Sequence, residues 1–159
     1  MDIARSRRRS RLRNKGQRNP EGVGVIFCGL VLCGATGFGG TAGAGNVYTL
    51  NLSGLETLLY SFAGPYSQRP GRLTIDATGN LYGETLYGGV SDVGALFELD
   101  TSGVETLLYS FTGGADGWLP FGGVIRDTTG NLYGTAQVGG NLTCGGSGYG
   151  CGTIFKLTP

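Results

Sequence analysis

The sequence predicts an all-β chain of two four-stranded antiparallel repeats that resemble propeller blades, a partial β-propeller, after an N-terminal signal segment. Two internal repeats carry this prediction. LETLLYSF at residues 55–62 returns as VETLLYSF at residues 104–111, and DATGNLYG at 76–83 returns as DTTGNLYG at 127–134. The copies lie 49 and 51 residues apart, a period typical of one four-stranded blade.

Four short strand-like segments with turn signals between them make up the first unit, at residues 46–50, 56–62, 73–75 and 81–82. Leu58, Tyr60 and Phe62 share one face of their segment, which is the period-two alternation of a strand in a packed sheet. After residue 45, no glycine-free stretch has apolar residues at helical spacing. We therefore expect strands and turns throughout this part of the chain.

The repeated Asp-x-Thr-Gly-Asn element predicts a tight hairpin turn. The carboxylates of Asp76 and Asp127 can accept hydrogen bonds from backbone N–H groups two or three residues later. Gly79 and Gly130 can adopt the positive φ that such turns require. A calcium loop is disfavoured, because the alternating ligands and the distal glutamate are missing.

The N-terminal region has the layout of a secretory signal peptide. A basic stretch at residues 5–18 precedes an apolar run at 23–38 and small residues at 42–44, which predicts cleavage after Ala44 and membrane contact during export only. An uncleaved membrane anchor is the alternative.

Residues 45–159 carry four basic and nine acidic residues, a net charge of −5, which disfavours nucleic-acid binding. The expected units are 1–44 for export, 45–93 and 94–151 as repeats, and 152–159 as the first strand of a further repeat or a closing strand.

The cysteines divide into two pairs. Cys28 and Cys33 lie within the expected signal segment and would leave with it. Cys144 and Cys151 lie seven residues apart in a glycine-rich loop, and export would expose them to an oxidising compartment, so we predict a disulfide between them. The chain has no histidine, so we predict no zinc site, no other metal and no cofactor.

Catalysis is not expected, because most of the carboxylates recur with the repeat and no nucleophile or phosphate-binding motif is present. Binding is the stronger expectation. Trp118 lies beside Asp116 in an inter-strand loop, and Tyr66 and Tyr87 hold comparable places, which suits a glycan or another cell-envelope component. The alternative is that Trp118 covers the edge of a blade or packs against Phe121.

DATGNLYGETLYGG, DTTGNLYGTAQVGG, LYSFTGGADGWLP and GTIFKL together resemble the tandem repeat of bacterial GloVer-containing extracellular proteins. The resemblance implies a secreted or cell-surface protein with propeller-like blades and brings no catalytic residues. Residues 63–70 and the cysteine loop depart from the pattern. Two blades are too few for a closed ring, so the alternatives are self-association through open blade faces, a small β-sandwich, a truncated repeat without its own function, or a fragment of a carbohydrate-active enzyme.

Overall fold

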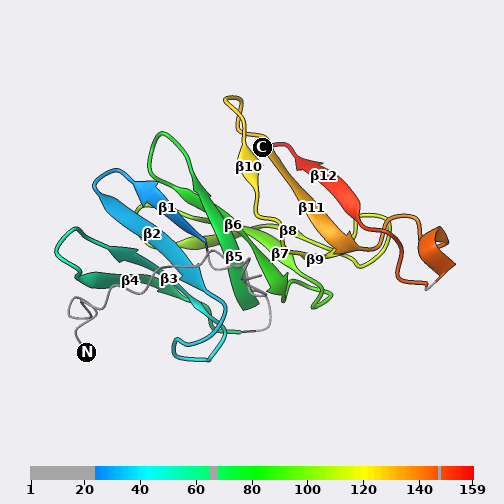
Figure 1. The fold of residues 1–159 in the computed structure, drawn as a ribbon, viewed down its shortest axis with the longest axis horizontal. Helices are drawn as coiled ribbons and strands as arrows, with labels where there is room; N and C mark the ends of the chain where they lie inside the picture. Colours follow the sequence, from blue (N-terminus) through cyan, green and yellow to red (C-terminus); the bar gives the residue numbers. More distant parts are fainter. Residues whose placement is uncertain (1–23, 65–67, 147) are drawn as a thin grey trace, which may run out of the picture.

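A computed structural model describes residues 24–64, 68–146 and 148–159. These residues form three antiparallel sheets, which confirms the all-β, blade-like prediction (Figure 1). Blade 1 contains β1 (Val25–Cys28), β2 (Val31–Thr36), β3 (Asn46–Leu50) and β4 (Glu56–Ser61). Blade 2 contains β5 (Gln68–Ile75), β6 (Leu81–Tyr87), β7 (Ala95–Leu99) and β8 (Glu105–Ser110). Blade 3 contains β9 (Trp118–Pro120), β10 (Ile125–Arg126), β11 (Leu132–Val138) and β12 (Thr153–Leu157), with a 3-10 turn, η1, at Cys144–Gly146.

The blades begin and end at places other than those predicted. The four segments of the first predicted repeat all form strands, but β3 and β4 pair within blade 1, whereas β5 and β6 pair within blade 2. A repeated motif shows how long each unit is, but it does not show at which residue a unit begins. The same pattern is therefore compatible with the predicted units and with the observed blades. The segment 152–159 contains β12, which pairs with β11 and lies at the edge of blade 3. The described residues therefore contain three blades where two were predicted.

The apolar run predicted to be the core of a signal peptide forms the first two strands of blade 1. β1 pairs with β2, and β2 pairs with β3, so residues 24–44 and the strands that follow belong to one sheet. The sheet of blade 1 therefore continues across the predicted boundary after Ala44. Ala35 of this apolar run is fully buried, and Ala44, at the predicted cleavage site, is partly buried against the core between blades 1 and 2. The basic residues at 5–18 lie outside the described part of the chain.

The cysteines of this region also have a structural role. Cys28 and Cys33 form a disulfide across the β1–β2 hairpin, with their Cα atoms 5.9 Å apart. Both cysteines of the expected signal segment are thus bonded to each other within blade 1.

In each of the three blades, an aromatic ring packs over a glycine on the neighbouring strand. Gly83 of β6 lies opposite Phe97 of β7, and a Cβ atom at Gly83 would come within 2.6 Å of that ring. Gly34 lies under Tyr48 in blade 1 in the same way, and Gly134 lies under Phe155 in blade 3. The matching pair at Gly34 and Tyr48 identifies residues 24–50 as part of a third repeat.

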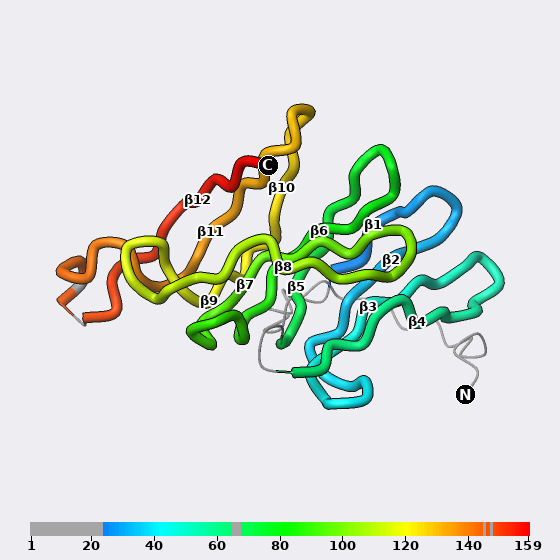
Figure 2. The backbone as a smooth tube through the Cα atoms, turned by 180° about the vertical axis from the view of Figure 1, so that it is seen from behind, coloured from blue at the N-terminus to red at the C-terminus, as the bar shows by residue number. Residues whose placement is uncertain are grey.

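The apolar core lies between the blades and forms two clusters. The first cluster joins blades 1 and 2, and its buried members are Cys33, Ala35, Val47, Phe62, Leu73, Leu81, Phe97 and Leu99. The second joins blades 2 and 3, and its buried members are Tyr82, Leu96, Phe111, Val124 and Leu132. The chain runs from blade 1 to blade 3 without crossing back, so each blade packs against its neighbours in sequence (Figure 2).

The predicted hairpin turns are present. The Oδ1 atom of Asp76 accepts hydrogen bonds from the backbone N–H groups of Thr78 and Asn80, and Asp127 does the same two and four residues later. Gly79 and Gly130 have φ values of 96° and 92°. Partial burial acts to raise the pKa of Asp76, but the hydrogen bonds from Thr78, Asn80 and Tyr82 outweigh it and hold this pKa at about 2.

Candidate functional site

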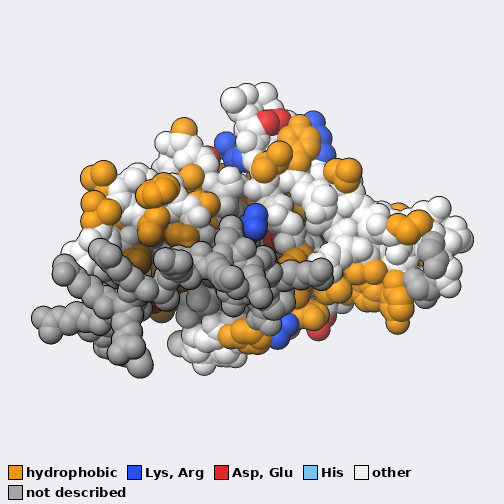
Figure 3. Space-filling view, viewed as in Figure 1, with side chains coloured by type: hydrophobic (Ala, Val, Ile, Leu, Met, Phe, Trp, Pro, Cys, Tyr) orange, Lys and Arg blue, Asp and Glu red, His pale blue; other side chains and the backbone are white. Residues whose placement is uncertain are grey.

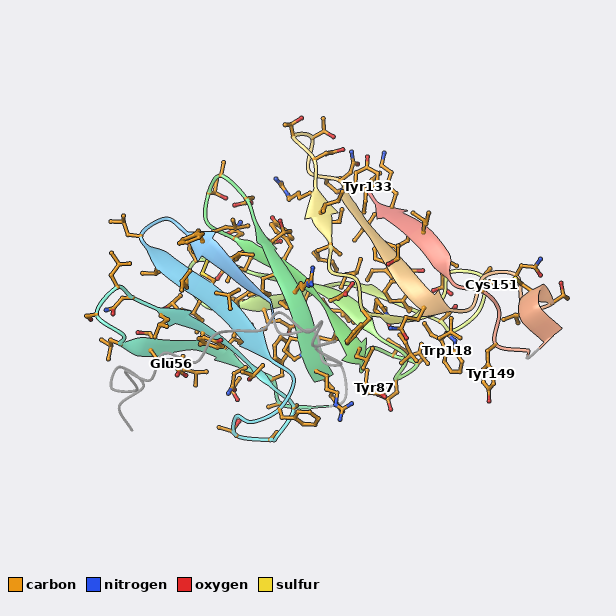
Figure 4. The ribbon with its side chains drawn as sticks, in the orientation of Figure 1. Glu56, Tyr87, Trp118, Tyr133, Tyr149 and Cys151 are labelled. Carbon is orange, nitrogen blue, oxygen red and sulfur yellow. A yellow bond between two sulfur atoms is a disulfide. The ribbon has the colours of Figure 1, made fainter. Side chains whose placement is uncertain are left out.

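The loops that contain the predicted binding residues lie at one end of the blades, which we call the loop end. It consists of the loops at residues 37–45, 88–94, 111–117 and 139–152, together with the adjoining strand ends. Figure 4 shows Tyr87, Trp118, Tyr149 and Cys151 at this end, whereas Tyr133 lies toward the opposite end of its strand. The sheet topology therefore brings three segments far apart in the sequence to one surface.

Trp118 lies in β9, where it pairs with Val138. Its ring stacks on Tyr149 with ring centroids 6.1 Å apart and an interplanar angle of 22°. The indole Nε1 atom is buried and has no hydrogen-bond partner among the described residues. Trp118 is therefore half-buried, and its ring partner is Tyr149, whereas the sequence suggested Phe121.

Asp116 organises the loop before β9. Its carboxylate accepts hydrogen bonds from the Tyr109 hydroxyl at 2.9 Å, the Thr112 backbone N–H at 2.7 Å and the Thr112 hydroxyl at 2.5 Å. Burial acts to raise the pKa of Asp116, but these bonds lower it overall. Both carboxylate oxygens of Asp116 thus bind Thr112 or Tyr109. The structure therefore does not bring Asp116 and Trp118 together as a pair of ligand-binding groups.

Tyr149 is placed by the cysteine loop. Cys144 and Cys151 form the predicted disulfide, with their Cα atoms 5.7 Å apart. The backbone carbonyl of Tyr149 accepts a hydrogen bond from Gly139 N–H at 2.7 Å, which ties the loop to the end of β11. The loop that only one sequence repeat contains therefore carries an aromatic ring onto Trp118.

A second aromatic group lies where blades 1 and 2 meet. The Arg69 guanidinium lies 4.3 Å from the centroid of the Phe38 ring and 5.4 Å from that of Tyr87, both within the range of a cation–π interaction. Arg69 has a φ of 56°, and Leu119 has the corresponding conformation in blade 3 with a φ of 53°. Tyr87 thus belongs to this cluster. Tyr66 lies outside the described residues.

Sequence reasoning missed Arg69 and Phe38. Arg69 lies in the segment 63–70, where the two sequence repeats differ most, and that difference was the available signal. Phe38 lies in the expected export segment, where no sequence signal indicates a blade.

Glu84 is the carboxylate with the most altered environment. It is fully buried in β6, where Oε1 accepts a 2.5 Å hydrogen bond from Gly123 N–H of blade 3. Its Oε2 atom has no hydrogen-bond partner among the described residues. Burial raises the pKa of Glu84 to about 7, against the opposing effects of that hydrogen bond and the Arg72 guanidinium. Its neighbours are therefore a backbone amide and a cation, whereas a glycosidase would require a second carboxylate.

The described residues show neither a cluster of metal ligands nor a membrane-spanning helix. They contain no group of three or more His, Cys, Asp or Glu side chains placed to hold a metal ion. None of the described helical segments is long and apolar enough to cross a membrane.

The family of the chain follows from a sequence profile that matches residues 11–159 and is described as a Gloeobacter/Verrucomicrobia repeat. The chain belongs to this repeat family. The match confirms the GloVer resemblance and extends it to residues 11–44, in agreement with the third blade seen in the structure.

Solved structures of low sequence identity share the fold. A streptogramin B lyase is similar with a TM-score of 0.52 and 15% identity, over 90% of this chain and 43% of that one. A putative gluconolactonase is similar with a TM-score of 0.50 and 17% identity, over 67% of this chain and 38% of that one. The chain therefore has a propeller-like fold and spans less than half the length of either neighbour. No curated protein matches the sequence.

Proposed function

We propose that this repeat protein is a non-catalytic binding module that works outside the cytoplasm and holds a glycan of the cell envelope at its loop end. The observation that carries the proposal is the gathering of aromatic rings at this end from four separate segments. Trp118 and Tyr149 stack in blade 3, and Phe38 and Tyr87 flank Arg69 between blades 1 and 2.

The chemistry of these groups suits a sugar. Aromatic rings offer flat apolar surfaces on which the apolar face of a sugar can stack. The Arg69 guanidinium has donors in a fixed planar arrangement, which suits the hydroxyl or carboxylate oxygens of a polysaccharide. These features support a ligand with both an apolar face and many oxygen atoms.

The location rests on the cysteines. Both disulfides in the described residues close short loops, and stable disulfides are typical of proteins outside the cytoplasm. The basic segment at residues 5–18 is part of this proposal as an export signal, although the apolar run that follows it lies in blade 1. No reaction is proposed, because the recurring acids Asp76 and Asp127 hold turns and Asp116 holds its loop.

A titration tests the proposal directly. Trp118 is the only tryptophan, so its fluorescence reports on this surface alone. Addition of cell-wall polysaccharides to the full chain should change the emission in a saturable way. Arg69→Ala should weaken the binding at least tenfold, whereas Val90→Ala, at an exposed loop position without a ring contact, should leave it unchanged. If no glycan alters the emission, the proposal is wrong.

A further inference from the structure

A cavity of about 460 Å³ lies between blades 1 and 2 at the end of the blades opposite the loop end. We call this end the turn end, because it consists of the short turns at residues 29–30, 51–55, 76–80, 100–104 and 127–131. Figure 3 shows apolar side chains gathered over blade 1, where β1 and β2 join. The volume falls within the roughly 300 to 1,000 Å³ of small-molecule sites. The wall of this turn-end cavity is mostly apolar and contains Cys28, Val31, Cys33, Leu59, Ile75 and Leu81.

The same place at the junction of blades 2 and 3 holds a tyrosine ring. Tyr82 of β6 lies opposite Glu98 of β7 and is 8% exposed. Its hydroxyl donates a hydrogen bond to Glu98 Oε1 at 3.2 Å, and the Arg126 guanidinium of blade 3 lies 5.2 Å from its ring centroid. A cavity of about 250 Å³ lies beside these three side chains. An aromatic ring and two charged groups thus occupy the turn end of that junction.

The junction of blades 1 and 2 has smaller, uncharged side chains at these three positions. Cys33 of β2 lies opposite Thr49 of β3, in the register of the tyrosine–glutamate pair of blade 2. Ile75 of β5 corresponds to Arg126 of β10, because each lies opposite the leucine of a repeated Asn-Leu-Tyr-Gly motif. The disulfide holds Cys33 against Cys28, away from other partners. The turn-end cavity therefore lacks a ring and two charges that the repeat supplies at the next junction.

The rim of the cavity is acidic. Asp76 and Asp100 lie there with Thr78 and Thr101, and the described residues that line the cavity include no lysine or arginine. The pKa of Asp76 is about 2 for the reasons given above. Hydrogen bonds from the Ser102 hydroxyl and from the backbone N–H groups of its turn lower the pKa of Asp100. Both carboxylates are thus ionised in neutral solution.

We propose that the turn-end cavity binds a small organic cation with an apolar body, of the size of an aromatic amine. The apolar body fills the space that the Tyr82 ring fills at the next junction, against Leu59, Ile75 and the disulfide. The ammonium group lies at the rim, where Asp76 and Asp100 attract a cation and repel an anion. This site and its ligand class are distinct from the proposed glycan surface, because the two lie at opposite ends of the blades.

A matched series of ligands tests the chemistry. Tryptamine, tryptophol and indole-3-acetate share an indole ring and carry a positive, no and a negative charge. Calorimetric titration of the full chain should give tryptamine a Kd of about 1 mM or tighter, as its twelve or so non-hydrogen atoms allow. Tryptophol should bind at least about threefold more weakly, because it lacks the charge. Indole-3-acetate should not bind measurably.

Restoring the missing ring tests the location. The double variant Cys28→Ser with Cys33→Tyr places in β2 the side chain that β6 has at this register position, and it should abolish tryptamine binding. The matched control, Cys28→Ser with Cys33→Ser, removes the same disulfide but leaves the space open. It should bind tryptamine with a Kd within about twofold of the wild type. Circular dichroism checks that both variants are folded.

A substitution at the rim tests the charge without filling the cavity. Asp100→Asn keeps an oxygen for the turn, since Asn51 holds the matching turn of blade 1 with hydrogen bonds to its Oδ1 from the backbone N–H groups of Ser53 and Leu55. The variant should weaken tryptamine binding and leave tryptophol binding unchanged. Asp127→Asn makes the same change in the turn of blade 3, outside the cavity, and should leave the binding of both ligands unchanged.

Three results would overturn the inference. These are the absence of tryptamine binding at several millimolar, equal binding of tryptamine and indole-3-acetate, or tryptamine binding that persists in the folded Cys33→Tyr variant. If that variant does not fold, equal tryptamine binding by Asp100→Asn and the wild type contradicts the proposal instead. Arg69→Ala should leave tryptamine binding unchanged, so failure at this site and failure of glycan binding at the loop end are separate results.

Discussion

The two junctions between blades share one framework and differ in polarity. Phe62 packs edge-on against Phe97 at the first junction, and Phe111 packs against Phe155 at the second, each pair with ring centroids 5.1 Å apart. Ala35 is buried at the first junction, and Glu84 holds the corresponding position at the second. The comparison shows that the aromatic contacts define a junction, and that one buried position between the blades tolerates either an apolar or an acidic side chain.

The backbone opposite Glu84 explains how the second junction accepts a carboxyl group. Gly123 has a φ of 81° and directs its N–H at the Glu84 Oε1 atom. Gly123 stands four residues before Asp127, at the position that Arg72 holds before Asp76. At this position the first junction is apolar, whereas the second has a hydrogen bond from the backbone to a buried acid.

The largest expected effect comes from the shared aromatic contacts. Phe62→Ala and Phe111→Ala should each lower the free energy of unfolding by about 3 to 5 kcal/mol, because each removes a fully buried ring and leaves a cavity. Urea unfolding measures both. If the framework is common to the two junctions, the two losses should agree within about 1 kcal/mol. Leu52→Ala, at an exposed turn position, should change stability by less than about 0.5 kcal/mol.

If either phenylalanine variant lowered the free energy of unfolding by less than about 1 kcal/mol, the two junctions would not share one framework. It would mean that the blade on that side unfolds separately and contributes little to the measured transition. Hydrogen exchange of the backbone amides in β2 and β11 would then identify which blade opens first.

The next effect concerns the polarity of the second junction. The pKa of Glu84 is raised to about 7 in the folded state, so the folded chain binds a proton more tightly than the unfolded chain does. The contribution of the Glu84 side chain to the free energy of unfolding is therefore greatest below pH 4.5 and falls as the pH rises to about 7. The shift corresponds to a loss of about 3 kcal/mol over this range. Unfolding of the wild type at pH 5 and pH 8 should show this loss.

Glu84→Gln provides the matched control, because it keeps the size and a carbonyl oxygen for the Gly123 N–H but cannot ionise. The difference in stability between wild type and Glu84→Gln should change with pH, and that change should lie between about pH 4.5 and pH 7. Comparison with this variant cancels the opposite contributions of Asp76 and Asp127, whose lowered pKa values stabilise the fold above the acidic range. A difference that is independent of pH would contradict the assignment.

The smallest effect concerns the two disulfides. Two double variants remove one disulfide each: Cys28→Ser with Cys33→Ser, and Cys144→Ser with Cys151→Ser. Each should lower the free energy of unfolding by about 2 kcal/mol, because both bonds close short loops. Only the second replacement should alter the fluorescence of Trp118, since its partner Tyr149 lies in that loop. Thermal unfolding and emission spectra separate the two results. An equal change in emission from both replacements would show that Trp118 does not depend on the cysteine loop.

The predicted strands and turns were largely correct, because they depend on local patterns. The alternation at 57–62 corresponds to β4, and the Asp-x-Thr-Gly-Asn elements form the expected turns. The first blade was missed because a run of small and apolar residues after a basic stretch fits both a signal segment and a pair of buried strands. The pairing of Gly34 with Tyr48 distinguishes them, and it is visible only when the sheet is formed.

The candidate site was only partly predictable. The bond between Cys144 and Cys151 follows from their spacing, whereas Tyr149 and Arg69 acquire their places from contacts with distant residues. Asp116 stands next to Trp118 in sequence, yet its carboxylate is held by Thr112 and Tyr109. Proximity along the chain does not show which partner a polar group selects.

The sequence by itself determined the period of the repeat, the strand character of its segments, the turns at Asp76 and Asp127, and the family. Each of these depends on neighbouring residues or on the order of motifs. The tertiary structure decided where each blade begins, that residues 24–44 belong to the first, and that Glu84 is buried. Those features depend on which strands pair and which faces pack together, and such contacts join residues that the order of the chain leaves far apart.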